Sequence, residues 1–196
     1  MLFRSRLAEK ISAKTKVVVP VHLYGLCCDM KPIMTLAREH NLLVVEDACH
    51  CVGGRYFGQA AGTIGDIGCF SFHEQKNIST LGEGGMVITR DPDLFERMSL
   101  YRSHCTRVYG PSTKYCLIDE NKYPKGKWFW RQEFDDTGYN FRLTDIQAAV
   151  GIEQLKKLDH FNRLRNENAA YLTNALSGLN GLLLPQVPAG YEHTFH

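Results

Sequence analysis

Short apolar runs separated by amphipathic stretches dominate the first half of the chain. Residues 17–23 form an apolar, β-branched run of strand length, and residues 42–45 form a second one. Between them the pattern predicts a helix over about 31–40, with Asp29 as its N-cap and Pro32 in its first turn. A strand, a helix and a strand in this order form a crossover that joins parallel strands, so the sequence predicts a covered α/β sheet.

Two further strands and another helix follow the first unit. The pattern predicts strands over 67–72 and 86–89, separated by a glycine-rich turn at 82–85. Asp91 is expected to cap a helix over about 92–103, because a proline directly follows it at the first helical position. The first hundred residues therefore extend the same α/β pattern.

The second half of the chain has a different character. Residues 105–139 are irregular and rich in aromatic side chains, which indicates a long excursion between regular elements. The Thr-Asp-Ile-Gln sequence at 144–147 fits a capping box and opens an apolar stripe of helical period that continues to about Leu176. We expect this single long helix to connect two domains.

Composition narrows the class of protein. The chain has 196 residues, 44% of them hydrophobic and 22% charged, with a net charge of +2, which is typical of a globular protein and does not favour a nucleic-acid binder. It has no apolar run of membrane-spanning length and no apolar secretory signal. Seven cysteines, an odd number without a C-x-x-C pair, are expected to be reduced in the cytoplasm. Residues 1–16 are basic, and we favour a solvated amphipathic segment over a transit peptide.

Chemically versatile side chains gather just after the predicted strands, where ligands of α/β sheets collect. Strand alternation places Glu46 and Asp47 on opposite faces, so only one of them can point at a given ligand. The other candidates at strand ends are His22, Tyr24, Ser71, His73 and Lys76. Any one of these residues alone could be a surface or capping group. The sequence has no dinucleotide fingerprint, no Walker lysine loop and no nucleophile elbow.

Five motifs occur in order along the chain, at residues 20–25, 45–50, 65–77, 82–85 and 138–149. They read PVHLYG, VEDACH, GDIGCFSFHEQKN, GEGG and GYNFRLTDIQAA. Together they resemble the DegT/StrS-type sugar aminotransferases, which are pyridoxal-phosphate enzymes of fold type I that aminate nucleotide-linked keto sugars. The resemblance begins at about the eighth residue and continues to the end of the sequence.

The resemblance implies the fold and the domain organisation. Residues 1–143 would be part of the cofactor-binding large domain, with a mostly parallel sheet and helices on both faces. Residues 144–196 would be the interdomain helix and the beginning of the small domain. Family members are much longer and carry a Ser-Gly-Thr phosphate-binding loop upstream, so we expect this chain to be a fragment that lacks both ends.

The resemblance also assigns roles to individual residues. Lys76 would hold the cofactor as a Schiff base and carry protons, and Asp47 would pair with the pyridine nitrogen. His50 would lie against the ring near its phenolic oxygen, Ser71 would bind the phosphate, and Asn140 would reach the phosphate from a neighbouring subunit, which implies a homodimer. Three more residues are family-typical, with packing or loop-shaping roles equally open: His73, Glu83 and Arg142. No metal ligand is expected.

The implied reaction is transfer of an amino group, with glutamate as the expected donor, to a nucleotide-linked keto sugar in amino-sugar and polysaccharide biosynthesis. Lys76 favours transamination, because relatives that carry histidine in place of this lysine catalyse dehydration. Neither nucleic acid nor a membrane is an expected partner. Two alternatives stay open: a non-catalytic remnant or partner-binding fragment of such an enzyme, and another fold-type I lyase or desulfurase.

Overall fold

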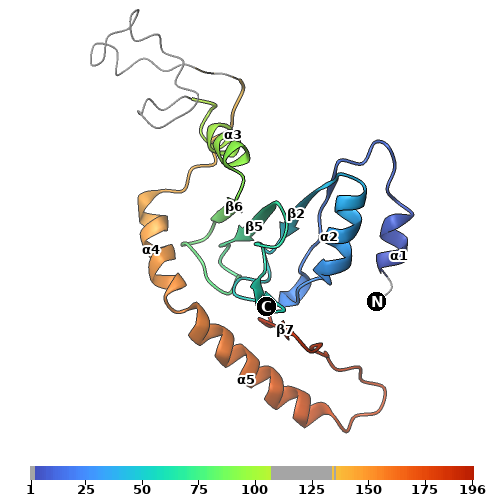
Figure 1. The fold of residues 1–196 in the computed structure, drawn as a ribbon. Coiled ribbons are helices and arrows are strands. Elements are labelled where there is room, and N and C mark those ends of the chain that lie inside the picture. Colours follow the sequence, from blue (N-terminus) through green and yellow to red (C-terminus); the bar gives the residue numbers. More distant parts are fainter. Residues whose placement is uncertain (1–2, 107–133, 135) are drawn as a thin grey trace, which may run out of the picture. The chain divides into compact units, whose positions relative to one another are not determined.

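The computed structural model describes residues 3–106, 134 and 136–196 (Figure 1). The chain divides into two compact units, of which the first comprises Met1–Arg90 and Leu143–His196 and the second comprises Asp91–Arg142. Most of the aromatic stretch predicted to be irregular lies outside the described residues, as does the cysteine at 116.

A four-stranded sheet forms the centre of the first unit, in the order β1-β2-β5-β6. Its strands are β1 (Val17–Val18), β2 (Leu43–Asp47), β5 (Ile67–Ser71) and β6 (Gly85–Thr89). β1, β2 and β5 are parallel, whereas β6 pairs antiparallel with β5 along its full length. The predicted mostly parallel α/β sheet is therefore confirmed.

The first strand is shorter than the predicted 17–23, and Pro20 explains the difference. Proline has no backbone N–H, so it interrupts the ladder that begins in β1. Pairing with the end of β2 nevertheless resumes, because the Asp47 N–H donates to the Pro20 carbonyl (2.9 Å) and the His22 N–H donates to the Asp47 carbonyl (3.0 Å). A short 3₁₀ turn, η1 (Leu23–Gly25), follows. The end of this interrupted strand is thereby fixed beside Asp47.

Helix α2 (Met30–Glu39) packs against β2 and begins one residue before the predicted start. Asp29 occupies the N-cap position, but its side chain caps no helix N–H, so this part of the prediction is wrong. The Tyr56 hydroxyl takes its place, since it accepts the Lys31 N–H (3.2 Å) and donates to the Asp29 carboxylate (2.7 Å). A buried core lies beneath the helix: Cys27, Met30, Ala37, Val44, Ala48, Cys51, Tyr56 and Ala61. A short helix, α1 (Phe3–Ala8), contacts α2.

A second, small sheet has the order β4-β3-β7, and both pairings are antiparallel. It consists of β3 (Arg55–Tyr56), β4 (Gln59–Ala60) and β7 (Tyr191–Glu192). The pairing of β7 with β3 returns residues 191–196 to the region that follows β2. None of these two-residue strands was predicted from the sequence.

The predicted long helix over 144–176 is two helices, α4 (Asp145–Leu155) and α5 (Leu158–Leu176) (Figure 1). The capping box is confirmed, because Thr144 and Gln147 exchange side-chain and backbone hydrogen bonds. Directly after the break at 156–157, the Leu158 side chain packs in a small buried cluster with Val52 and Ile78. The interruption of the helix thus coincides with the burial of Leu158.

The second unit contains helix α3 (Pro92–Arg102), whose predicted cap is confirmed because the Asp91 carboxylate accepts the N–H groups of Asp93 and Leu94. An isolated antiparallel bridge joins Ser103 to Asn140. Across the part of the chain that the structure describes, no helix is long and apolar enough to span a membrane.

Candidate functional site

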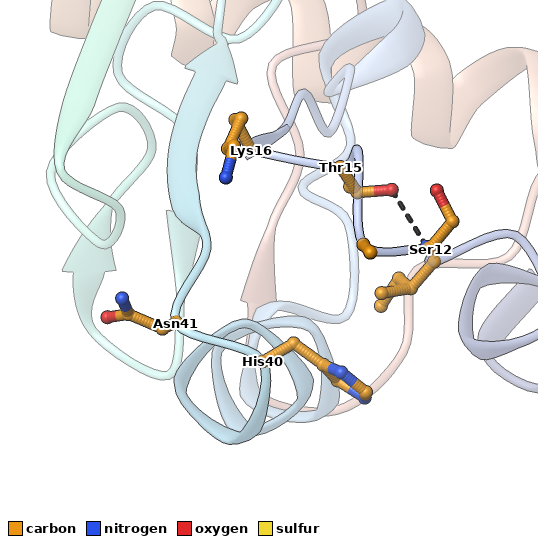
Figure 2. A pocket seen from close by; sticks show the side chains of 7 residues that line it. Ser12, Thr15, Lys16, His40 and Asn41 are labelled. Carbon is orange, nitrogen blue, oxygen red and sulfur yellow. Dashed lines mark hydrogen bonds between the residues drawn. The ribbon is translucent and has the colours of Figure 1, made fainter.

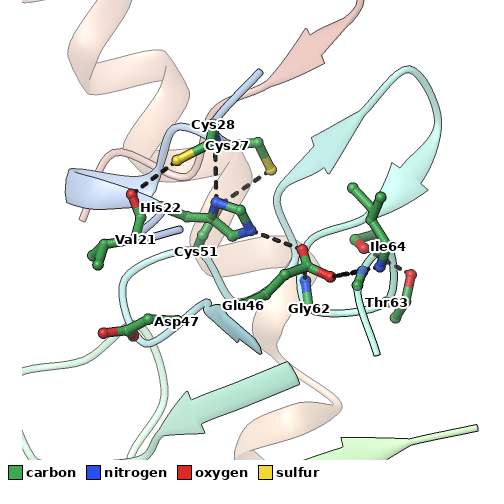
Figure 3. Close-up of polar contacts among 12 residues, drawn as sticks. Val21, His22, Cys27, Cys28, Glu46, Asp47, Cys51, Gly62, Thr63 and Ile64 are labelled. Atoms are coloured by element: carbon green, nitrogen blue, oxygen red, sulfur yellow. Dashed lines mark hydrogen bonds and ion pairs between the residues drawn. The ribbon is translucent and has the colours of Figure 1, made fainter. Parts of the chain in front are cut away.

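The two adjacent acids at the end of β2 have separate environments, as strand alternation predicts. Glu46 is fully buried, and its carboxylate accepts a hydrogen bond from His22 Nε2 (2.8 Å) (Figure 3). The backbone N–H groups of Gly62, Ile64 and Gly65 donate to the same carboxylate. Burial alone would raise the pKa of Glu46, but these hydrogen bonds outweigh it and lower that pKa. Glu46 is therefore an ionised structural anchor.

Asp47 points away from the His22–Glu46 pair (Figure 3). It is only partly buried, and its carboxylate accepts the Cys49 N–H (3.1 Å). In the parallel register Asp47 lies opposite Cys69 of β5, and Ser71 lies two residues further along on the same face. The Ser71 hydroxyl oxygen accepts the His73 N–H (3.3 Å). One face of the sheet thus carries the carboxylate and the hydroxyl at the carboxyl ends of two strands.

Lys76 lies in the turn that follows β5, where its N–H donates to the His73 carbonyl (2.9 Å). Among the described residues its side-chain amine makes no hydrogen bond or ion pair. The charges of Lys76 and Asp47 nevertheless act on the same two neighbours, His50 and Cys49. The fold therefore brings this amine and this carboxylate, 29 positions apart, to one end of the sheet.

The pKa values of His50 and Cys49 are shifted by the charges of both Lys76 and Asp47. Burial, followed by the charge of Lys76, lowers the pKa of His50, and Asp47 opposes the change. Burial and a hydrogen bond with Asp47 raise the pKa of the Cys49 thiol to about 12. His50 is thereby a neutral imidazole at neutral pH, and Cys49 is a protonated thiol without nucleophilic character.

Residues 193–196 also contribute to the site, although the sequence reasoning missed them. The Thr194 hydroxyl donates to the His50 carbonyl (3.1 Å), and the Thr194 N–H donates to the carbonyl of Gly25 (3.0 Å). This close approach requires glycine, since Gly25 has a φ of 97° and a Cβ atom there would overlap the Thr194 hydroxyl. The ring of His196 lies against that of His50, with 4.3 Å between the ring centres.

Asn77, which directly follows Lys76, connects this terminal segment to α5. Its amide nitrogen donates to Asn162 Oδ1 (2.9 Å), and its amide oxygen lies 3.2 Å from His196 Nδ1. These partners are 85 and 119 residues away in sequence. No local pattern could have predicted them, and the only available signal is the position of Asn77 beside the candidate lysine.

The remaining predicted site residues differ in how the structure places them. His73 Nε2 lies 3.7 Å from the carboxylate of Glu83, whose backbone carbonyl accepts hydrogen bonds from Thr80 and Gln147. These contacts give His73 and Glu83 a loop-shaping environment. Asn140 and Arg142 belong to the second unit, where Arg142 donates to the Ser103 hydroxyl (3.1 Å). The structure thus brings Lys76, Asp47, His50 and Ser71 to one end of the sheet and describes Asn140 separately.

One surface pocket lies elsewhere, between Ser12–Lys16 and His40–Asn41 (Figure 2). These segments directly precede β1 and β2, so the pocket lies at the amino ends of the parallel strands. Ligands of open α/β sheets bind at the carboxyl ends. This pocket is therefore not the candidate site. Within the described ranges, no group of histidine, cysteine and acidic side chains is arranged to hold a metal ion.

The mostly parallel α/β sheet has the fold of the type I pyridoxal-phosphate aminotransferases. Within that class, the chain belongs to the DegT/DnrJ/EryC1/StrS aminotransferase family, whose model matches residues 1–196. The resemblance drawn from the five motifs is thereby confirmed.

Curated relatives of this chain include several named sugar aminotransferases. The chain is 39% identical to the UDP-N-acetyl-3-dehydro-alpha-D-glucosamine 3-aminotransferase of Acidithiobacillus ferrooxidans, over 95% of this chain and 44% of that protein. It is 38% identical to the GDP-perosamine synthase of Caulobacter vibrioides, over 97% of this chain and 46% of the relative. The chain thus spans about half the length of the curated relatives it matches.

The solved structures support the same fold. The aminotransferase TlmJ from Streptoalloteichus hindustanus superposes with a TM-score of 0.85 at 32% identity, over 98% of this chain and 47% of that one. An aminotransferase from Psychrobacter cryohalolentis gives a TM-score of 0.84 at 33% identity, over 98% and 48% of the two chains. The predicted fold class is confirmed by these neighbours.

Proposed function

We propose that this chain is the catalytic segment of a pyridoxal-phosphate-dependent aminotransferase that aminates a nucleotide-linked keto sugar. The observation that carries the proposal is the Lys76 amine, which has no polar partner among the described residues and whose charge, with that of Asp47, acts on His50. One named relative is an aminotransferase of a UDP-linked sugar, and another is a synthase of the GDP-linked sugar perosamine. Both names support this substrate class.

The residues present fit the cofactor chemically. An amine and a carboxylate at one end of the sheet are the groups that pyridoxal phosphate needs for a Schiff base and for a partner of its pyridine nitrogen. A neutral imidazole and a hydroxyl lie at the same end. In this proposal Lys76 holds the aldehyde carbon, Asp47 pairs with the pyridine nitrogen and His50 lies against the ring. Ser71 binds the phosphate, joined by Asn140 from a second subunit.

When bound, the cofactor supplies a carbonyl that accepts the amino group and a ring that withdraws electrons from the adjacent carbon. Asp47 keeps a proton on the pyridine nitrogen, because its negative charge favours the protonated ring. Lys76 Nζ, once released by the substrate, takes a proton from one carbon and returns it to another. The single amine thus serves both as the attachment point and as the general base.

We further propose glutamate as the amino donor, a homodimer as the working form and the cytoplasm as its location. In this proposal residues 144–196 contain the connection to a small domain, with α4 and α5 in place of one helix.

Covalent trapping tests the proposal. Purified protein is mixed with pyridoxal phosphate, reduced with borohydride and digested, and the modified peptide is identified by mass spectrometry. We expect one phosphopyridoxyl group per chain, on Lys76, together with an absorbance band that free cofactor lacks.

A matched control separates specific from adventitious labelling. Lys156 is exposed and paired with Glu153 on α4, so Lys156→Ala should leave the labelling unchanged, whereas Lys76→Ala should abolish it. Labelling spread over surface lysines, or unchanged in Lys76→Ala, would contradict the proposal and favour a non-catalytic fragment.

A further inference from the structure

His50 is held by three separate contacts that come from distant parts of the sequence. The Tyr24 N–H points at its Nδ1 atom (3.3 Å), the Thr194 hydroxyl donates to its carbonyl, and the His196 ring lies against its ring with a tilt of 30°. The contacts with Tyr24 and His196 act on the ring, whereas the contact with Thr194 holds the backbone of His50.

The tautomer follows from the contact with Tyr24. A backbone N–H can only donate, so the Nδ1 atom of His50 must be the acceptor and cannot carry a proton. The proton of the neutral ring is therefore on Nε2. Tyr24 adopts a left-handed backbone conformation, with φ 55° and ψ 17°, which is costly for a non-glycine residue. In this strained conformation the backbone N–H of Tyr24 points at the Nδ1 atom of His50.

The orientation of His196 is set by a directional chain of amides. Asn162 donates to the Val52 carbonyl (3.0 Å), so its amide oxygen is available to accept from Asn77 (2.9 Å). The nitrogen of the Asn77 amide is thereby committed as donor, and its oxygen must accept from His196 Nδ1 (3.2 Å). His196 consequently has its proton on Nδ1, the opposite tautomer to His50.

We propose that the Tyr24 backbone and the His196 ring are positioning elements that hold His50 as an Nε2–H donor. The resemblance to the family implies that the phenolic oxygen of the cofactor is the acceptor. This inference rests on the proposed function for its target, but the tautomer itself does not. The charged groups that act on the two histidines are Lys76, Asp47 and Arg165. Burial, with the nearby cations, lowers the pKa of His196 to about 4, so its ring brings no charge against His50 at neutral pH.

Nitrogen NMR tests the tautomer without any catalysis. In uniformly ¹⁵N-labelled protein without cofactor, the His50 signals, assigned through His50→Gln, should show a protonated Nε2 and an unprotonated Nδ1. A coupling across the hydrogen bond should join Nδ1 to the Tyr24 amide nitrogen. Tyr24→Gly removes only the side chain and relieves the backbone strain, so the tautomer should persist in this control. A protonated Nδ1 in the wild-type protein would overturn the inference.

The absorbance of bound pyridoxal phosphate tests whether His50 is held in position as a donor. With pyridoxal phosphate bound, His50→Phe should raise the pH midpoint of its absorbance change by about one unit, since one hydrogen bond to the phenolic oxygen is lost. His196→Ala should move the midpoint in the same direction, whereas His196→Phe keeps a ring against His50 and should restore most of the wild-type value.

The two hypotheses fail in different ways. If His196→Ala and His50→Phe both leave the midpoint unchanged while Lys76 still holds the cofactor, the positioning role is overturned and the proposed function stands. If the cofactor does not bind at all, the proposed function fails and the directed donation fails with it, and the NMR signals alone decide the tautomer of His50.

Discussion

At the scale of single residues, the decisive contrast is between two neighbouring acids with opposite tasks. Glu46 is surrounded by donors from His22 and the 62–65 segment, so its charge is compensated inside the protein. This anchor fixes the end of β2 and leaves Asp47 on the opposite face. Strand alternation predicted that the two side chains diverge, but it could not say which acid belongs to the site.

Replacing Glu46 with glutamine tests the anchor. The amide presents a donor where four N–H groups converge, so we expect Glu46→Gln to lower the free energy of unfolding by about 2–4 kcal/mol, measured by urea denaturation at neutral pH. Glu167→Gln, at an exposed residue paired with Arg163 on α5, is the control and should change stability by less than about 0.5 kcal/mol.

The pH dependence of the stability of Glu46→Gln provides a second test of the anchor. The folded pKa of Glu46 lies below its unfolded value, so its contribution is fully present above the unfolded pKa and is lost as the pH falls through the folded one. Wild-type stability should therefore drop more steeply on acidification than that of Glu46→Gln. Equal slopes for the two proteins would show that Glu46 is not held ionised.

At the scale of elements, local signals predicted what local contacts determine. The Asp91 cap and the Thr144 capping box could be predicted from the sequence because their partners lie two or three residues away. The break between α4 and α5 and the strands of the small sheet could not be predicted in this way. Each of these coincides with tertiary contacts, such as the packing of Leu158 against Val52. Periodicity alone carries no information about such contacts.

The start of α2 offers a test at this scale. Tyr56 is buried and takes the capping role that the sequence assigned to Asp29. Tyr56→Phe leaves the Lys31 N–H and the Asp29 carboxylate without this partner, so we expect a loss of about 1–2 kcal/mol in thermal unfolding. Tyr171→Phe, on the exposed surface of α5, is the matched control. Equal stability of both variants would contradict the capping role of Tyr56.

At the scale of the whole molecule, the candidate site combines segments that the motifs revealed with segments they did not. The motif around 65–77 pointed to Lys76, and the motif around 45–50 pointed to Asp47 and His50. The contribution of residues 193–196 depends on β7 pairing with β3, more than a hundred positions away. Such long-range closure is fixed by the fold, so only the structure could reveal it.

In the proposed function, Lys76 and Asp47 form the working centre of an aminotransferase. The most direct test is a single turnover with ¹⁵N-glutamate and the protein loaded with pyridoxal phosphate, followed by mass spectrometry. We expect ¹⁵N-pyridoxamine phosphate and 2-oxoglutarate in equal amounts, with one of each per Lys76. In Lys76→Ala at saturating cofactor, the rate should fall by about a hundred- to ten-thousand-fold. Transfer of the label by Lys76→Ala at the wild-type rate would contradict the claim.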